Sequence, residues 1–215
     1  MFIIHYCKCN DLRILSNELY RKLFDLIPPG IYGLLSIVLC SIFIIVSYSN
    51  FPGYNMIEND VSVLGIGPGI SAPLFNIGII STGIVLILFY CSLRYSFFKE
   101  LTNLSMVNKV SKSSVISSVA LALIGCFPVV NFTIGLIHAL LALIFFGFCC
   151  ISMIFYGLIF RKLELFSKHH AYLSFYIAAI IVFYIMTRWS IVEWIVFFSY
   201  GIWILDISIF TLKKT

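Results

Sequence analysis

The residues best suited to chemistry are a small set of polar side chains in an otherwise apolar chain of 215 residues. The densest group lies within residues 54–83, where carboxylates, amides and several glycines occur together. Carboxylates and imidazoles can move protons, and a guanidinium can bind a phosphate. We therefore consider one candidate binding site, built from Asn59, Asp60, Ser62, Asn76, His138, Arg188 and Glu193.

These polar groups stand out because 61% of the chain is apolar, only 11% is charged, and the mean hydropathy is +1.07. A soluble domain carries about 25% charged residues. This chain has too few charges to cover a surface that faces water, so it is predicted to lie in a bilayer. The net charge of +5 reflects membrane topology, and no nucleic acid partner is expected.

Several kinds of chemistry are disfavoured. A transmembrane haem needs two facing histidines, but only His138 lies within an apolar run, whereas His169 and His170 are predicted to be cytoplasmic. No Gly-rich phosphate loop and no Gly-x-Ser-x-Gly motif occurs in the sequence. The segment His5-Tyr-Cys7-Lys-Cys9 offers three soft ligands without a second cluster, and Asp206 is interpreted as an interfacial acid. We predict no catalytic residue, no metal and no cofactor.

The first 30 residues form a segment of their own. Leucines recur at helical spacing from Leu12 to Leu26 with charged residues between them, which is typical of an amphipathic helix at a membrane interface. Pro28-Pro29-Gly30 ends this pattern. The chain is therefore divided into a cytoplasmic amphipathic segment, residues 1–30, and a transmembrane domain, residues 31–215.

Six apolar runs follow, and the predicted fold is all-α, a six-helix transmembrane bundle. A span needs about 20 residues, and its backbone must satisfy its own hydrogen bonds in lipid. The third run carries a ridge of small residues, and its Ser113 and Ser117 are expected to bond back to their own backbone. The runs cover residues 31–49, 72–97, 109–127, 132–160, 171–187 and 191–212.

The positive charges predict how the bundle is oriented. Thirteen of the 14 Lys and Arg residues fall on one side of the predicted membrane, and only Arg188 falls on the other. The positive-inside rule then places both termini in the cytoplasm. The chain is predicted to be a multi-pass protein of the cell membrane. Residues 50–72 form the longest loop on the outer side, and its glycines favour a bent segment over the mouth of the bundle.

All seven candidate residues fall on this outer side, which predicts one polar pocket there, because strongly polar groups near hydrocarbon usually face an interior or a wet cavity. Simpler interpretations remain open for each residue. His138 could make a structural hydrogen bond, Arg188 and Glu193 could form an interfacial ion pair, and Asp60 could cap the loop. A site is therefore predicted from the convergence of several of these residues, and no single residue is sufficient.

Short motifs in this chain resemble a prokaryotic six-span family, domain-of-unknown-function family 998, which is related to the Frag/DRAM/Sfk membrane proteins. The resemblance covers residues 29–212. Val63 stands where the family loop usually has an aspartate, and Asp60 lies three residues earlier. The matching residues are Pro29-Gly30-Ile-Tyr-Gly33, Asn59-Asp-Val-Ser62-Val-Leu64-Gly65, Phe75-Asn76-Ile-Gly78, Gly83, Gly125-Cys-Phe-Pro128 and His138, with a looser match at Glu193 and Trp203.

The resemblance implies architecture more than activity, and its eukaryotic relatives are linked to membrane lipid remodelling. We rank a lipid-handling protein first. Arg188 would bind a phosphate, while Asn76, His138 and Asp60 would form hydrogen bonds with the headgroup. A scaffold, a small proton-coupled transporter using His138 and Glu193, and an enzyme with His138 as base follow in that order. Membrane lipids are the expected partners, and a homo-oligomer is left open.

Overall fold

The computed structural model describes residues 24–100, 104–164 and 166–214, and within them it confirms the predicted all-α fold. Six helices are long and apolar enough to cross a membrane. A short 3-10 helix, η1 (Val61–Ile66), lies between the first two. The six are α2 (Pro29–Ser49), α3 (Ser71–Glu100), α4 (Leu104–Cys126), α5 (Phe132–Lys162), α6 (Lys168–Thr187) and α7 (Ser190–Leu212).

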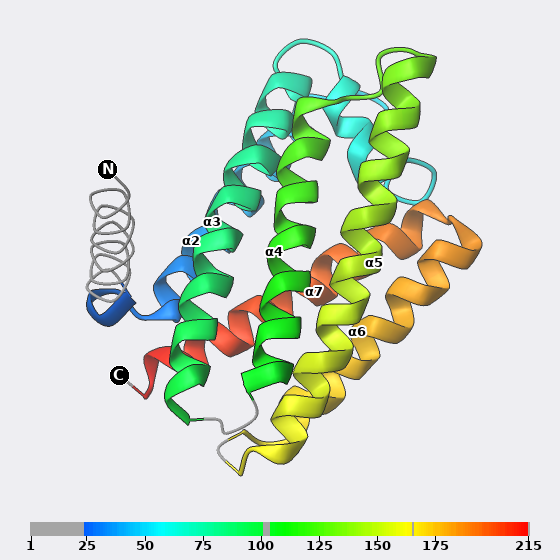
Figure 1. The fold of residues 1–215 in the computed structure, drawn as a ribbon. Coiled ribbons are helices and arrows are strands. Elements are labelled where there is room, and N and C mark those ends of the chain that lie inside the picture. Colours follow the sequence, from blue (N-terminus) through cyan, green and yellow to red (C-terminus); the bar gives the residue numbers. More distant parts are fainter. Residues whose placement is uncertain (1–23, 101–103, 165, 215) are drawn as a thin grey trace, which may run out of the picture.

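The helices form a closed ring in chain order. Each helix packs against the next one along the chain, and α2 closes the ring by packing against α7. The α2–α3 and α4–α5 connections lie at the end that is uppermost in Figure 1, whereas α7 ends at the opposite side. We call these two ends of the bundle the loop end and the terminal end.

Aromatic side chains fill the interior of the helix bundle toward its terminal end. Tyr90, Tyr156, Phe160 and Trp203 are each at most 1% exposed and belong to one large apolar cluster. The Tyr156 and Trp203 rings lie 5.0 Å apart and join α5 to α7 across the interior. Because lipid tails are as apolar as these side chains, close packing rather than escape from water holds the helices together.

A smaller apolar cluster lies at the loop end. Its buried residues come from α2, the α2–α3 connection, α3, α4 and α7, and they include Tyr54, Leu64, Phe75 and Trp194. The two clusters share no buried residue, and Leu121, Ala142 and Phe145 pack against both of them. The interior therefore has one densely packed half and one half that is covered by a loop.

Close helix approach is clearest between α3 and α4. A Cβ added at Gly83 would lie 2.7 Å from the backbone nitrogen of Ala122 and 2.8 Å from the carbonyl oxygen of Ser118. The small residues predicted on this face of α4 therefore let the two backbones approach. Farther along, Ser113 donates to the Val110 oxygen of its own helix, as expected. The prediction for Ser117 was wrong, because its hydroxyl donates to the Phe145 oxygen of α5 at 3.1 Å and joins two helices.

The predicted amphipathic helix of residues 1–30 falls mostly outside the described residues. Phe24 is the first residue that the structure describes, and its ring lies 6.2 Å from that of Tyr32 at the start of α2.

Replacing Gly83 with alanine should destabilise the bundle, because the new methyl group would meet α4 backbone that cannot move aside. We expect Gly83→Ala to cost about 1–3 kcal/mol, the usual range for overpacking, and to lower Tm in detergent. Gly147→Ala is the matched control, since a Cβ at Gly147 meets nothing within 4 Å. Equal Tm values for the two variants would contradict this account of the α3–α4 contact.

Candidate functional site

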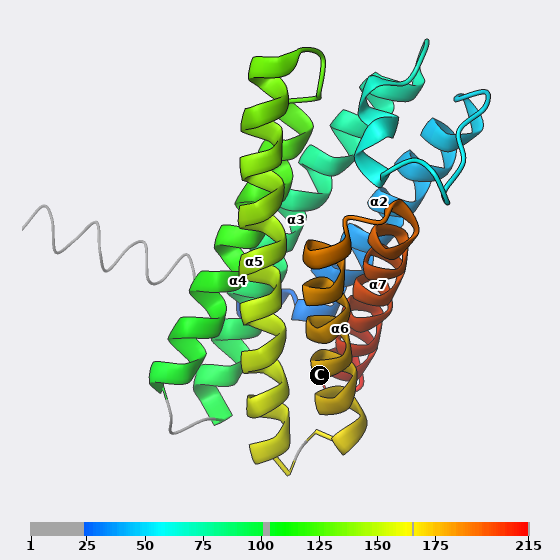
Figure 2. The ribbon, with the colours of Figure 1, turned by 90° about the vertical axis from the view of Figure 1, so that its right-hand side faces the viewer.

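The connection between α2 and α3, residues 50–70, folds over the loop end of the bundle and is called the cap loop below (Figures 1 and 2). Tyr54 stabilises the fold of the loop, since its hydroxyl donates to the backbone carbonyl oxygen of Asp60 at 2.8 Å. Burial raises the pKa of the Tyr54 phenol above its ordinary value, so the group stays protonated and keeps donating.

Three hydrogen bonds attach the cap loop to α7. The Trp194 indole donates to the backbone carbonyl oxygen of Asn59 at 3.2 Å, and the Ser190 hydroxyl donates to the backbone carbonyl oxygen of Glu58 at the same distance. The Val61 N–H donates to Oε2 of Glu193 at 3.0 Å. Residues more than 130 positions apart in the chain are thereby held together.

The other side of the cap loop is attached to α3. The Asn76 side chain donates to the Gly65 oxygen at 3.0 Å. A Cβ at Gly65 would lie 2.7 Å from Oδ1 of Asn76, so only glycine lets the loop come this close to the amide. Asn76 therefore positions the cap loop.

Beneath the cap loop lies a cavity of about 590 Å³ to which all six membrane helices contribute. Its ionisable side chains gather near the loop end, and its deeper lining is mostly apolar with a few hydroxyls, among them those of Ser36, Thr82 and Tyr200. The polar residues include Asp60, Ser62, His138, Arg188 and Glu193, and the deeper apolar residues include Ile79, Leu86, Phe145, Phe146 and Ile204.

Glu193 is the central titratable group of this cavity. Its side chain is only 8% exposed, and Asp60, Arg188 and the Tyr184 hydroxyl are its polar neighbours. Arg188 and Glu193 form no ion pair within 4.0 Å in the part of the chain that the structure describes. Two carboxyl groups this close repel each other when both are ionised, so a ligand that donates to them relieves the repulsion.

Arg188 reaches the cavity from an unusual backbone position. It ends α6 with a φ of 56°, and it is the one non-glycine residue with a positive φ in the described ranges. Its guanidinium carbon lies 5.6 Å from the centre of the Tyr184 ring. A left-handed conformation is costly for arginine, and such strain concentrates at functional positions.

His138 makes a structural hydrogen bond and also lines the cavity. Its Nδ1 lies 2.8 Å from the Phe127 carbonyl oxygen. A carbonyl can only accept, so Nδ1 carries the proton, and Nε2 of the neutral ring is left as an acceptor. The two interpretations offered from the sequence are therefore compatible.

The structure brings five of the seven candidate residues to one cavity, and Asn59 and Asn76 are not among its lining residues. The Asn59 side chain accepts from the Asn55 N–H at 3.0 Å within the cap loop. Sequence reasoning missed Tyr184, which is buried and lines the cavity. Its position one helical turn before Arg188, on the same helix face, was the available signal.

A family model described as "Protein of unknown function (DUF998)" matches residues 34–208, which is most of the chain. The chain belongs to this family. With its six apolar helices, it is a multi-pass membrane protein. No curated protein and no solved structure matches it.

Removing the acceptor of the Val61 N–H should loosen the cap loop of this family member. Glu193→Leu leaves that buried donor unpaired, which lowers the free energy of unfolding by about 1–3 kcal/mol. Glu193→Gln keeps a side chain of the same length with an oxygen that can accept the hydrogen bond. We expect faster amide hydrogen exchange at residues 59–63 in Glu193→Leu and near-unchanged exchange in Glu193→Gln. Equal exchange in both variants would show that this bond does not hold the loop.

Proposed function

We propose that this protein binds a lipid headgroup, or a polar lipid precursor, in the cavity beneath the cap loop. The observation that carries the proposal is the division of the cavity lining into a loop end that holds its charged groups and a depth that is mostly apolar, with a few hydroxyls. A lipid has the same division. Specific pockets are mostly apolar with a few polar groups that fix orientation, and a volume of about 590 Å³ is in the usual range for small ligands.

The polar groups favour a particular headgroup chemistry. Arg188 is the single cation among the lining residues and suits a phosphate. Asp60, Glu193 and Nε2 of His138 are acceptors. The best match is a headgroup that combines a phosphate with hydroxyl or ammonium donors.

The proposal also includes the orientation of the chain in the membrane and its relation to other membrane proteins. The termini would face the cytoplasm of a prokaryotic cell membrane, and the cap loop would face outward, because Arg188 is the one Lys or Arg predicted on that side. A relation to the Frag/DRAM/Sfk membrane proteins, which the sequence resemblance implies, is consistent with lipid handling but is an analogy.

A small proton-coupled transporter is the second candidate, and the adjacent carboxyl groups of Asp60 and Glu193 favour it. The aromatic packing of Tyr90, Tyr156 and Trp203 below the cavity argues for a pocket closed at one end instead of a path through the bundle. Proton-coupled uptake in proteoliposomes that is lost on His138→Ala would support the transporter.

Filling the apolar part of the cavity should expel lipid. Gly201 lines the cavity, and a Cβ there meets nothing within 4 Å, so the ring of Gly201→Phe has room to enter. We expect lipid retention to fall by about tenfold, or ~1.4 kcal/mol of binding free energy, measured by native mass spectrometry of protein extracted into polymer nanodiscs.

Gly147→Phe is the matched control, because Gly147 also has open space at its Cβ but does not line the cavity. It should retain lipid like the wild type. Equal retention in both variants would contradict the proposal. No retained lipid in the wild type, together with a higher Tm for Gly201→Phe, would favour a scaffold.

Headgroup donors should decide which lipid stabilises the protein. Phosphatidylethanolamine and phosphatidylglycerol carry donors, whereas the trimethylammonium of phosphatidylcholine has none, so we expect the first two to raise Tm more in delipidated protein. Arg188→Gln should weaken the stabilisation by all three lipids, while Arg161→Gln, at an exposed site outside the cavity, should not. Equal stabilisation by the three lipids would contradict the assigned headgroup chemistry.

A further inference from the structure

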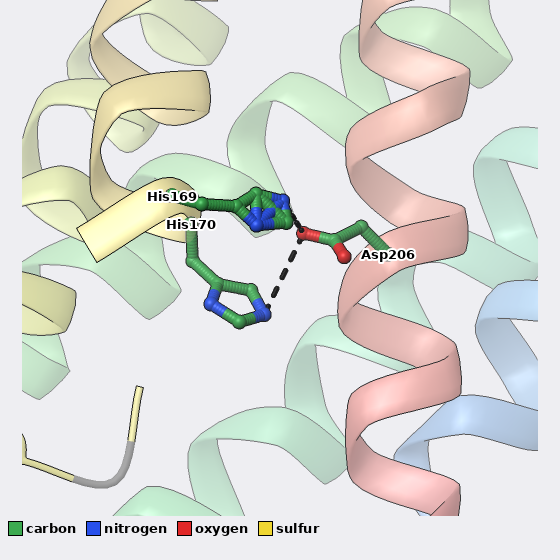
Figure 3. A group of neighbouring side chains, drawn as sticks. All are labelled: His169, His170 and Asp206. Carbon is green, nitrogen blue, oxygen red and sulfur yellow. Dashed lines mark ion pairs between the residues drawn. The ribbon is translucent and has the colours of Figure 1, made fainter. Parts of the chain in front are cut away.

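A second group of polar side chains lies at the terminal end, away from the cavity. His169 and His170 belong to the first turn of α6, and Asp206 lies near the end of α7. Figure 3 shows both imidazole rings directed toward the same carboxylate oxygen. We call these three residues the His–His–Asp cluster.

The spacing within the cluster resembles that of ligands around a metal ion. Nε2 of His169 lies 3.2 Å from Oδ2 of Asp206, and Nε2 of His170 lies 3.6 Å from the same oxygen. All three ligand atoms lie within 4.8 Å of one another. In a tetrahedral site with bonds of about 2.0–2.1 Å, neighbouring ligand atoms are about 3.3 Å apart.

Hydrogen bonding alone leaves the carboxylate unsatisfied. Oδ2 of Asp206 is buried, yet it has no partner that meets hydrogen-bond geometry. The two nitrogens approach it without aligning as donors. A buried carboxyl oxygen whose only close polar contacts are two ion-pair contacts without hydrogen-bond geometry is poorly satisfied, and a cation between the three groups would satisfy it.

The His170 ring is held in an orientation that suits a ligand. Its Nδ1 lies 2.8 Å from the Ser167 hydroxyl and 3.3 Å from the Ser167 carbonyl oxygen. Donation to that carbonyl leaves Nε2 with a free lone pair facing Asp206. Metal-bound histidines commonly donate their other ring nitrogen in this way, which fixes the tautomer and the ring.

Packing fixes the two helices that supply the ligands. The Trp203 indole of α7 donates to the Ser174 hydroxyl at 2.8 Å, and that hydroxyl donates to the His170 carbonyl oxygen at 2.7 Å. The Phe166 and Phe210 rings lie 5.5 and 5.1 Å from the His170 ring. The ligand-bearing turns of α6 and α7 are therefore joined independently of any ion.

We propose that His169, His170 and Asp206 bind one divalent transition-metal ion, with Zn²⁺ as the best match. Two imidazoles and one carboxylate suit Zn²⁺ better than Mg²⁺ or Ca²⁺, which prefer oxygen ligands. The His169 side chain is 58% exposed, so one side of the cluster is open and water completes the coordination. The ion would link α6 to α7 at the terminal end.

The test is Zn²⁺ titration of full-length protein that carries a tag without histidine and has been stripped with a chelator. His5, Cys7 and Cys9 could bind metal separately, so the decisive quantity is the difference between variants. We expect His169→Asn and Asp206→Asn each to lose one equivalent of Zn²⁺ by calorimetry and elemental analysis. The exposed carboxylate variant Glu164→Gln should lose none.

The absorption spectrum of the wild-type protein with Co²⁺ does not depend on the variants folding. Co²⁺ can replace Zn²⁺ in the wild-type protein. The Co²⁺ ion bound by the His–His–Asp cluster should show ligand-field bands without thiolate charge-transfer absorption. Zn²⁺ should also raise Tm in the wild type and in Glu164→Gln, but not in Asp206→Asn, because an ion that binds only the folded state stabilises it. Unchanged stoichiometry in both ligand variants, or only thiolate-bound Co²⁺ in the wild type, would overturn the proposal.

Discussion

The hydrogen bond from the Val61 N–H to the Glu193 carboxylate is the contact on which the loop end depends. It joins the cap loop to α7 inside a largely apolar region, where a buried unpaired donor or carboxylate is expensive. The same carboxylate faces the cavity beside Asp60 and Tyr184. One side chain therefore holds the cover of the cavity and also contributes to its polar lining.

The closed ring of helices explains why a cavity forms beneath the cap loop. Six helices packed in sequence enclose a central space that side chains must fill. At the terminal end large aromatic residues such as Tyr156 and Trp203 fill it, and they are essentially fully buried. The cavity lies between this aromatic packing and the cap loop, and Gly201 and Ala142 are among its lining residues. The aromatic packing supports a pocket closed at its deep end.

Much of the fold could be predicted because the bilayer imposes strict rules on each helix separately. The predicted run at 191–212 is within a residue of α7 (Ser190–Leu212), whereas the run at 171–187 missed the start of α6 at Lys168. Its first turn, Lys168-His169-His170, is polar, and hydropathy does not register it as part of a span. The expected Arg188–Glu193 ion pair is not found in the described residues, because the left-handed end of α6 directs Arg188 along the Tyr184 ring.

The sequence by itself determined the membrane class, the six spans and the uneven distribution of positive charge, because hydrocarbon thickness and backbone hydrogen bonding constrain each segment locally. Only the tertiary structure decided which polar groups meet. It brought Asp60, His138 and Glu193 to one cavity, assigned Asn76 to the cap loop, and placed His169 and His170 beside Asp206. These contacts depend on how helices far apart in the chain tilt and pack, which is set by the volumes of many interior side chains acting together.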